Sequence, residues 1–402
     1  MTSPPDKLDV KYGIDEIKAH KANKRVLIVA GEASGDQYGA ELIREVGALS
    51  PDTLFFGVGG RKMRQAGLLA LVRSEEVTVV GLIEVLKHLR TIKGALDLLK
   101  GSMRALRPDL IVLIDFPDFN FRVADAAVKL GKDGEKIPIF YYISPQVWAW
   151  RRGRVKTIAR FVDKMVVIFP FEVDIYREAG VDAEFLGHPL MDVVAGVEGS
   201  LKGSGDAEAK GGRPNVALLP GSRRSEIEKH LAHLLGASEI IKREYPNASF
   251  TIPLAPTLEI EDVSPYIEDS QLNVSVVKDS FHGVVRGADI AIVSSGTATI
   301  ETALMGTPMV VVYRLNYLTY LIARLLVRVD YIAMVNLVAK KQVVPELIQS
   351  DVNAENIARH ALAILSDDTV IKRMREDLSE VRRRIGKPGA SARVAERVVS
   401  FL

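Results

Sequence analysis

The segment Ser294 to Glu301 combines small residues, hydroxyls and a carboxylate directly after an apolar run. A helix that begins there presents backbone N–H groups, and its hydroxyls add donors, which together suit a phosphate. Glu301 lies one helical turn after Thr297, so its carboxylate suits ribose hydroxyls beside a diphosphate. A threonine followed by a glutamate is also typical of a capping box, so both interpretations stay open. The residues assigned to a nucleotide here are Ser295, Gly296, Thr297, Thr299 and Glu301.

A second turn, Pro220-Gly-Ser222, also follows an apolar run and is followed by Arg223. An arginine beside such a turn can hold a diphosphate and offset the charge of a leaving group. The alternative is a plain strand-to-helix connection with a surface arginine. Because the two turns lie in the same half of the chain and reinforce each other, we assign Ser222 and Arg223 to the same nucleotide.

Two aspartates follow the apolar run 109–114, and either can serve as a general base for an attacking hydroxyl. Asp115 comes directly off the predicted strand, whereas Asp118 lies further into the loop and is freer to reach a substrate. Aspartates also cap loops, which is the alternative for both. We take Asp118 as the candidate base.

The turn Gly31-Glu-Ala-Ser-Gly-Asp36 follows the first apolar strand but lacks the G-x-G-x-x-G spacing of a dinucleotide site. In an enzyme that uses a nucleotide sugar, this loop would face the cleft from the acceptor side. A catalytic role and a structural role are equally open for His188 in Gly187-His-Pro189. The residues assigned to the acceptor side are Glu32, Ser34, Asp36, Asn120 and His188.

Apolar residues recur at helical spacing between 82 and 96, with basic residues between them. The pattern is typical of a helix at a membrane surface, although a core-facing stripe gives the same spacing. The residues assigned to a membrane are Leu82, Val85, Leu86, Leu89, Lys87, Arg90 and Lys93. The segment 144–154 holds both tryptophans beside Arg151, Arg152 and Arg154, which suits an anionic lipid head group as well as core packing.

Composition bounds the function. The 402 residues carry 53 Lys and Arg against 51 Asp and Glu, so no overall charge favours nucleic acid. The chain has no cysteine, which excludes disulfides, thiolate metal sites and a cysteine nucleophile. No H-E-x-x-H or ligand-spaced acidic cluster implies a metal, and we expect no cofactor. No apolar run reaches the roughly 20 residues of a spanning helix, and 1–24 lacks the apolar region of a secretory signal.

Strands that alternate with helices predict an α/β fold with parallel sheets. The predicted strands are 26–30, 54–57, 109–114, 137–143, 164–168, 215–219, 249–254, 273–277, 289–293 and 309–313. We divide the chain into a charged extension (1–24), an N-terminal α/β domain that holds the acceptor and membrane candidates (25–195), a Gly/Ser-rich linker (196–213), a C-terminal α/β domain that holds the nucleotide-sugar candidates (214–370) and a helical segment (371–402). That last segment is expected to pack back on the N-terminal domain or on a partner subunit.

Eight ordered segments resemble the lipid-A-disaccharide synthases, bacterial glycosyltransferases of the GT-B type with two Rossmann-like α/β domains facing across a cleft. They are GEASGD (31–36), GVGG (57–60), DFPDFN (115–120), SPQVWAWR (144–151), GHPL (187–190), LPGSR (219–223), SGTATIE (295–301) and VNLVA (335–339). The resemblance also implies that Asn336 and Gln342 lie near the nucleotide.

The resemblance implies transfer of 2,3-diacylglucosamine from UDP-2,3-diacylglucosamine to 2,3-diacylglucosamine 1-phosphate (lipid X). The products would be a β-1,6-linked tetraacyl disaccharide 1-phosphate and UDP. The family is inverting, needs no metal and is peripheral on the inner face of the inner membrane of Gram-negative bacteria. Some members are homodimers with exchanged C-terminal segments.

Two other interpretations remain. Another GT-B enzyme, such as a MurG-like transferase or a UDP-GlcNAc epimerase, would share the architecture; an epimerase needs no membrane face. A catalytically silent nucleotide-binding or lipid-binding protein is the second, and the set of Asp118, Arg223 and Glu301 argues against it.

Overall fold

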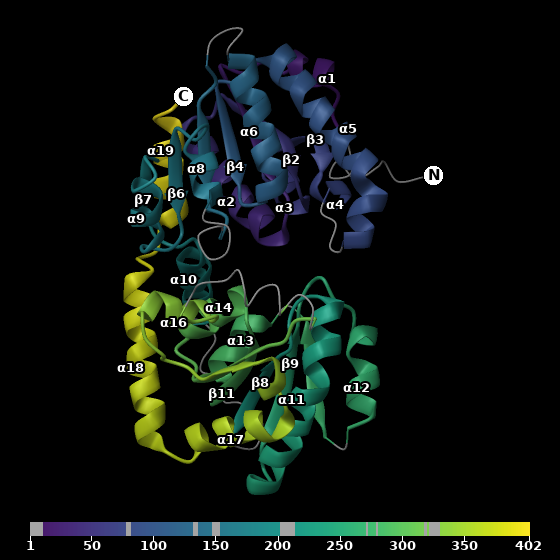
Figure 1. Cartoon of the computed structure of the whole chain (residues 1–402), viewed down its shortest axis with the longest axis vertical. Coiled ribbons are helices and arrows are strands. Elements are labelled where there is room, and N and C mark those ends of the chain that lie inside the picture. Colours follow the sequence, from purple (N-terminus) through teal and green to yellow (C-terminus); the bar gives the residue numbers. More distant parts are fainter. Residues whose placement is uncertain are drawn as a thin grey trace. The chain divides into compact units, whose positions relative to one another are not determined.

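A computed structural model gives the chain as two compact units (Figure 1). Unit 1 is Met1–Pro189 with Pro388–Leu402, and unit 2 is Leu190–Lys387. The structure describes residues 11–77, 82–131, 136–146, 153–201, 214–270, 272–278, 280–316, 320 and 330–402. Each unit contains one parallel sheet covered by helices, which is the predicted α/β class.

The sheet of unit 1 has seven parallel strands in the order β3-β2-β1-β4-β5-β6-β7. The chain runs outward from β1 to one edge and then returns to β4, so β1 and β4 flank the switch point where parallel sheets bind ligands. The strands are β1 (Lys24–Ala30), β2 (Thr53–Gly59), β3 (Leu69–Arg73), β4 (Leu110–Ile114), β5 (Ile139–Tyr142), β6 (Lys164–Val167) and β7 (Ala183–Phe185).

Helices cover both faces of this sheet because its central strands are apolar on both sides. Helix α2 packs against the C-terminal helix α19 on one face, and α5 packs against α6 on the other (Figure 1). The helices are α1 (Ile14–Ala19), α2 (Ala33–Leu49), α3 (Arg61–Gln65), α4 (Ser74–Val77), α5 (Leu82–Leu106), α6 (Pro117–Gly131), α8 (Gly153–Ile158), α9 (Glu172–Arg177) and α19 (Ala390–Val399).

The sheet of unit 2 has six strands in the order β10-β9-β8-β11-β12-β13, so its switch point lies between β8 and β11. The strands are β8 (Asn215–Leu219), β9 (Ser249–Leu254), β10 (Val274–Lys278), β11 (Ile290–Ser294), β12 (Met309–Tyr313) and β13 (Glu346–Ile348). Every residue of β11 is buried, as expected for a strand covered on both faces.

Helices α11 and α17 pack together on one face of this sheet, and α13 and α14 pack together on the other. The helices of unit 2 are α10 (Leu190–Leu201), α11 (Arg224–Glu244), α12 (Ser264–Glu268), α13 (Phe281–Gly287), α14 (Thr297–Leu304), α16 (Met334–Ala339), α17 (Ala354–Leu365) and α18 (Asp368–Arg384). Two short 3-10 turns are η2 (Ile260–Asp262) and η3 (Gln349–Asp351).

Helices lie in part of the expected N-terminal extension and in part of the expected linker. Residues 14–19 of the expected N-terminal extension form α1, whose fully buried Ile17 belongs to the core of unit 1. Residues 196–201 of the expected linker complete α10, because the apolar spacing of Leu190, Met191 and Val194 already favours a helix. Residues 202–213 lie outside the described residues.

The chain changes unit at Pro189 and again at Pro388, not within 196–213 or at residue 371. Helix α18 therefore belongs to unit 2, where Arg382 donates to Leu304 O and Arg384 donates to Val338 O. Residues Pro388–Leu402, which contain α19, belong to unit 1. The expected C-terminal segment is thus divided between both units.

Candidate active site

The turn after β4 holds the two candidate aspartates on a strained backbone. Asp115 and Phe116 have φ values of 43° and 45°, a region that non-glycine residues rarely adopt. Two buried side chains hold the turn: Asn120 donates to the Asp115 carbonyl at 2.7 Å, and the Tyr141 hydroxyl donates to the same oxygen at 2.6 Å. Strain of this kind is characteristic of functional sites, where the surrounding structure fixes it.

Burial, together with the nearby carboxylates of Glu32 and Glu172, raises the pKa of Asp115 to about 7 against an opposing backbone N–H. Glu32 follows β1 and Asp115 follows β4, so the two strands at the switch point bring these carboxyl groups together. Asp115 therefore exchanges its proton near neutral pH, which suits proton transfer.

Asp118 lies in the first turn of α6 and is well exposed, with 72% of its side chain accessible. Its carboxylate lies 2.5 Å from the guanidinium of Arg154, whose side chain also lies over the ring of Phe121. The ion pair orients an accessible carboxylate. Arg154, which the sequence suggested for an anionic lipid head group, therefore lies at the predicted base.

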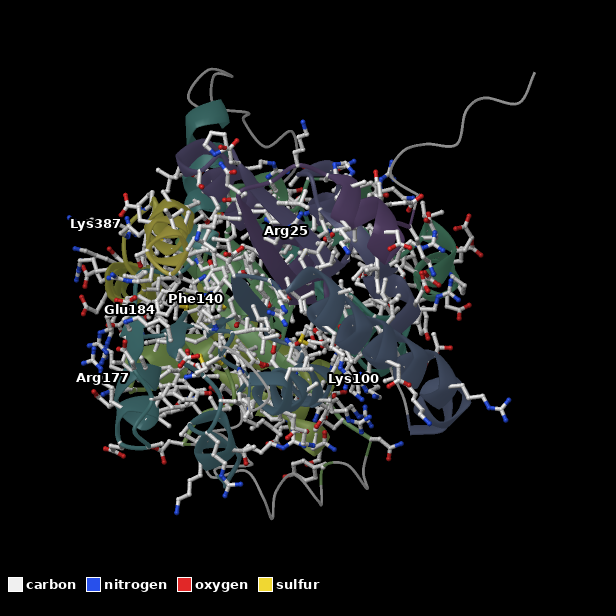
Figure 2. The ribbon with its side chains drawn as sticks, turned by 90° about the horizontal axis from the view of Figure 1, so that it is seen from above. Arg25, Lys100, Phe140, Arg177, Glu184 and Lys387 are labelled. Atoms are coloured by element: carbon white, nitrogen blue, oxygen red, sulfur yellow. The ribbon has the colours of Figure 1, made fainter. Side chains whose placement is uncertain are left out.

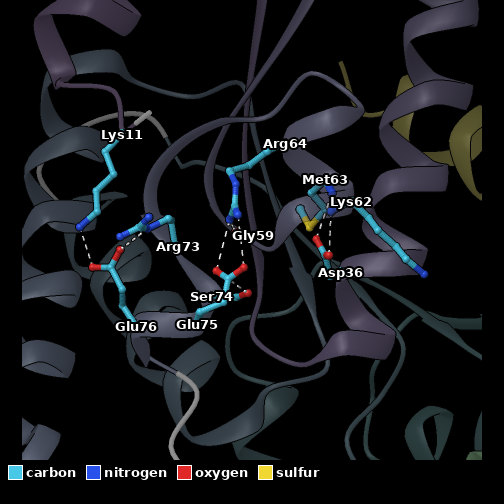
Figure 3. Close-up of polar contacts among 10 residues, drawn as sticks. All are labelled: Lys11, Asp36, Gly59, Lys62, Met63, Arg64, Arg73, Ser74, Glu75 and Glu76. Atoms are coloured by element: carbon cyan, nitrogen blue, oxygen red, sulfur yellow. Dashed lines mark hydrogen bonds and ion pairs between the residues drawn. The ribbon is translucent and has the colours of Figure 1, made fainter. Parts of the chain in front are cut away.

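Asp36 does not present its carboxylate to a substrate, which corrects its assignment. It is buried and accepts hydrogen bonds from the backbone of Lys62 and Met63, at 2.9 and 3.0 Å (Figure 3). The carboxylate thus satisfies the first N–H groups of α3, as side chains commonly do at helix N-termini. Glu32 is exposed and Ser34 is half-buried, so both stay candidates for the acceptor.

Asn120 and His188 are also buried scaffold residues rather than accessible ones. The amide of Asn120 holds the strained turn described above. Burial lowers the pKa of His188 to about 3, so its imidazole is neutral at physiological pH. Its ring packs edge-on against Tyr38 and Phe169, at centroid distances of 6.5 and 5.2 Å. A structural role therefore fits His188 better than a catalytic one.

Glu172 is a buried carboxylate at this edge that the sequence did not suggest. It accepts hydrogen bonds from the Ser144 hydroxyl at 2.5 Å and from the Phe169 backbone at 3.0 Å. These bonds connect the loops that follow β5 and β6. Nothing local in the sequence distinguishes Glu172 from a surface glutamate of α9.

In unit 2, the Ser295-Gly296-Thr297 turn joins β11 to the N-terminus of α14. Gly296 is the N-cap residue and no side chain caps the helix, so the alternative of a Thr–Glu capping box is wrong. The exposed Thr297 begins the helix, where backbone N–H groups lack intrahelical partners and suit an anion. Thr299 is buried and donates to the Gly296 carbonyl at 2.8 Å, so its hydroxyl belongs to the turn rather than to a ligand.

Glu301 lies one turn into α14 and remains partly accessible. Its Oε2 is 3.0 Å from Nε2 of His282 on α13, a neighbour that sequence reasoning missed. The imidazole thus lies beside the carboxylate proposed for the ribose.

The Ser222-Arg223 turn lies at the end of β8, next to β11 in the sheet. Arg223 is the N-cap residue of α11, and 53% of its side chain is exposed. The carboxylate of Glu226 accepts from the backbone N–H of Ser222 at 2.7 Å and of Arg223 at 3.2 Å. Glu226 follows the N-cap residue by three positions, which is the capping spacing that could have identified it.

Asn336 is fully buried and its amide is bonded to protein on both sides, which contradicts a direct contact with nucleotide. It donates to Val344 O and Glu346, and its oxygen accepts from the backbone of Val343 and Val344. These bonds hold α16 to the strand β13. Gln342, by contrast, is exposed and stays a candidate.

The structure describes the membrane assignments only in part. The side chains of Leu82, Val85, Leu86, Lys87 and Leu89 lie outside the described set, as do residues Arg151 and Arg152. Arg90 and Lys93 are exposed on α5. Within the described residues, no helix has the length and apolarity needed to cross a bilayer.

Two sets of accessible groups thus lie at the carboxyl ends of parallel strands, one set in each unit. In unit 1 they are Glu32, Ser34, Asp115 and Asp118; in unit 2 they are Ser222, Arg223, Ser295, Thr297 and Glu301. A family model described as lipid-A-disaccharide synthetase matches residues 26–396, which contain both sets. The chain belongs to this family.

Relatives in the lipid-A-disaccharide synthase family agree over nearly the whole chain. The protein of that name from Geobacter sulfurreducens is 45% identical over 378 residues, 94% of this chain and 97% of its own. Those from Trichlorobacter lovleyi and Nitrosococcus oceani are 46% and 44% identical over 382 and 381 residues, covering 94% of this chain and 98% and 96% of theirs.

Solved structures with a similar fold indicate that this chain has the GT-B fold. A UDP-GlcNAc 2-epimerase from Neisseria meningitidis, bound to UDP-GlcNAc, has a TM-score of 0.63 at 14% identity and covers 94% of this chain and 100% of its own. The calicheamicin glycosyltransferase has a TM-score of 0.59 at 15% identity, covering 94% and 98%. At such low identity the likeness concerns the fold alone.

Proposed function

We propose that the protein transfers 2,3-diacylglucosamine from UDP-2,3-diacylglucosamine to 2,3-diacylglucosamine 1-phosphate, giving the β-1,6-linked tetraacyl disaccharide 1-phosphate and UDP. The observation that carries the proposal is the family match over residues 26–396, which includes both sets of strand-end groups. The reaction is that of a lipid-A-disaccharide synthase, the name of the relatives above.

Unit 2 binds the nucleotide in this proposal. The diphosphate lies against the N-terminus of α14 and against Arg223, which are both positive and both accessible. Glu301 accepts hydrogen bonds from the ribose. As UDP leaves, Arg223 and the helix N-terminus offset the charge that develops on the β-phosphate; removal of one such donor typically costs about 2.7–4 kcal/mol in the barrier.

Unit 1 binds the acceptor and removes the proton from its 6-hydroxyl. Asp118 is the proposed base because its carboxylate is accessible and is oriented by Arg154. Asp115 is the second candidate because burial brings its pKa to about 7. Direct attack of the hydroxyl on the anomeric carbon inverts its configuration, and the cationic groups of unit 2 carry the charge without a metal ion.

We further propose that unit 1 meets the lipid surface on the inner face of the inner membrane. A groove of about 740 Å³ lies between α5, α6 and α8, with Phe121 and Phe161 among its apolar residues. Its lining is rich in basic residues, namely Lys100, Arg104, Arg122, Lys129 and Arg160, although Lys100 pairs with Asp97 and Lys129 with Asp125. Lys100 is labelled in Figure 2. Apolar and basic groups in one groove suit anionic lipid.

Incubation of the purified protein with both lipid substrates in detergent, with EDTA present, tests the proposal. Mass spectrometry should detect the tetraacyl disaccharide 1-phosphate and an equal amount of UDP. The anomeric coupling of the product in NMR should report the β linkage. Binding of UDP without any disaccharide would refute the proposed reaction.

The fold also fits an epimerase, since a UDP-GlcNAc 2-epimerase shares it. The same protein should therefore be incubated with UDP-GlcNAc alone. We expect no change at carbon 2, because the family members are disaccharide synthases by name. Appearance of UDP-ManNAc would move the assignment to the epimerase.

A further inference from the structure

His230, on the second turn of α11, bridges two strand ends of unit 2. It is buried, with 1% of its surface exposed. Its Nδ1 lies 2.9 Å from the carbonyl oxygen of Pro220, and its Nε2 lies 3.1 Å from the backbone nitrogen of Arg314. Because a carbonyl only accepts and a backbone N–H only donates, Nδ1 must carry the proton and Nε2 the lone pair. These contacts require the neutral imidazole in one tautomer.

The two contacted groups lie on either side of the Ser295-Gly296-Thr297 turn. Pro220 follows β8 and Arg314 follows β12, and β11 lies between those strands in the sheet. Adjacent strands are about 4.8 Å apart, so the imidazole connects strand ends separated by roughly 10 Å. The Ser295 turn at the end of β11 is tied to the same edge, since its N–H donates to Val312 O at 2.9 Å.

A few packing contacts and hydrogen bonds hold the turn that carries Arg223. Gly221 has φ 131°, and a side chain there would overlap the Glu226 carboxylate. Thr257 donates to the Ser222 carbonyl at 2.5 Å, and Glu226 accepts from the N–H groups of Ser222 and Arg223. The His230 contact fixes the beginning of the turn, at Pro220. On the β12 side, Leu315 N donates to Gln349 at 2.6 Å, which anchors the other end of the bridge.

We propose that His230 is a positioning residue for nucleotide-sugar binding: its neutral imidazole ties the Pro220–Arg223 turn to the end of β12 and so sets where Ser222 and Arg223 meet the diphosphate. The inference rests on the proposed function, since it takes this turn as the diphosphate site. His230 itself does not touch the substrate.

Protonation of His230 breaks the bridge. A second N–H then faces the backbone N–H of Arg314. The new charge lies near Lys229 and His233, which itself contacts the Arg314 side chain, and Glu226 is the opposing carboxylate. Burial lowers the pKa of His230, against the Pro220 carbonyl and Glu226, which raise it. The bridge is therefore intact at neutral pH and is lost only below the ordinary histidine range near 6.5. Burial and Arg314 also lower the pKa of His233, against Glu355, which raises it. Both histidines are therefore neutral at neutral pH.

Two variants separate positioning from simple folding. His230→Leu removes donor and acceptor, whereas His230→Gln keeps one of each and cannot titrate. Ser238→Ala is the matched control, because Ser238 is buried on the same helix and donates only to Leu234 O, within α11. Each variant is measured for KM of UDP-2,3-diacylglucosamine, KM of the acceptor, kcat, and UDP affinity by calorimetry between pH 5 and 8.

We expect His230→Leu to raise the KM for the UDP-sugar and the Kd for UDP about tenfold or more, with the acceptor KM changed less than twofold. His230→Gln should recover most of the affinity and weaken the loss of affinity at acid pH. Ser238→Ala should leave both constants unchanged.

The inference is overturned if His230→Leu binds UDP as Ser238→Ala does, or if His230→Gln keeps the full acid loss of the wild type. UDP binding is measured separately from turnover, so a wild type that binds UDP without forming disaccharide refutes the proposed reaction while the UDP comparison still decides the role of His230. A wild type that does neither removes the reaction and the inference together.

Discussion

At the residue scale, the strand ends of unit 1 gather three carboxyl groups whose surroundings differ. Glu172 is buried and hydrogen-bonded, Asp115 is partly buried beside Glu32, and Asp118 is exposed beside Arg154. Environments that separate the protonation of neighbouring carboxyl groups are typical of acid–base sites. Asp115 is the group that remains protonated to near neutral pH in the folded protein.

Asp115→Asn should remove a pH dependence of stability. The folded pKa of about 7 lies above the unfolded value of 3.8, so the folded state retains a proton that the unfolded state loses between pH 4 and 7. Stability of the wild type therefore falls as pH rises through this window. As the pH rises from 4 to 8, the free energy of unfolding of Asp115→Asn should increase by about 2–4 kcal/mol relative to that of the wild type.

Urea unfolding at pH 5 and pH 8 measures this gain. Asp97→Asn, which removes an exposed carboxylate of α5, is the control for the loss of a negative charge. An Asp115→Asn variant that gains nothing at pH 8 would show that Asp115 ionises as an ordinary aspartate.

Among the elements, the turn 31–36 that follows β1 passes close to the strained turn after β4. A side chain at Gly31 would overlap the ring of Phe116. Phe116 itself is held at φ 45° and stacks on Phe119 at 5.3 Å. The glycine of the first motif is therefore required by packing between the β1 and β4 loops.

Gly31→Ala should destabilise unit 1 by about 1–3 kcal/mol, the usual cost of overpacking. Removal of the ring in Gly31→Ala/Phe116→Ala should make the double variant less unstable than the sum of the single variants, which a denaturation cycle measures. Gly94→Ala is the control: the position lies open in α5 and should gain up to about 1 kcal/mol. Strict additivity of the two substitutions would contradict the packing argument.

The sequence predicted the elements well where the apolar runs were long. The strands 215–219, 249–254 and 309–313 have the predicted bounds, and β1, β4 and β11 differ by two residues or fewer. Strands β7 and β13 were missed because each has only three residues, and the five-residue edge strand β3 was missed as well. Short segments of that kind lack a distinctive period.

The position of the site groups at strand ends was predictable from the sequence, whereas their contacts within the protein were not. Arg223, Thr297 and Glu301 lie at accessible strand ends, as the spacing indicated. Asp36, Thr299 and Asn336 also lie within the eight recognised segments, but they bond to the protein's own backbone. Which polar residue of a motif faces inward depends on contacts between distant segments, and spacing does not contain that information.

At the scale of the whole molecule, the chain ends on the unit in which it began. Helix α19 buries Ala390, Val394, Ala395 and Val398, and packs on α2. Arg397 pairs with Glu184 at 2.7 Å, and Phe401 meets Phe140 edge-on; Glu184 and Phe140 are labelled in Figure 2. In a dimer with exchanged C-terminal segments, α19 would make the same contacts with unit 1 of the second copy. We propose that α19 is the segment exchanged in such a dimer.

Val394→Ala should destabilise unit 1 alone. Loss of buried methyl groups costs about 1–3 kcal/mol, whereas Arg397→Ala, at a partly exposed ion pair, should cost less than about 1 kcal/mol. Hydrogen exchange measures both, and faster exchange is expected in β1 and α2 but not in β8 or β11. Equal acceleration in unit 2 would contradict the assignment of Pro388–Leu402 to unit 1.

We propose that unit 2 binds the nucleotide and that unit 1 supplies the base for the acceptor hydroxyl. The most direct measurement compares UDP affinity with disaccharide formation for Asp118→Ala and Arg223→Ala. We expect Asp118→Ala to keep UDP affinity within twofold of the wild type and to lose turnover by about 100-fold or more. Arg223→Ala should lose both. An Asp118→Ala enzyme with normal turnover, or one that no longer binds UDP, would contradict the account.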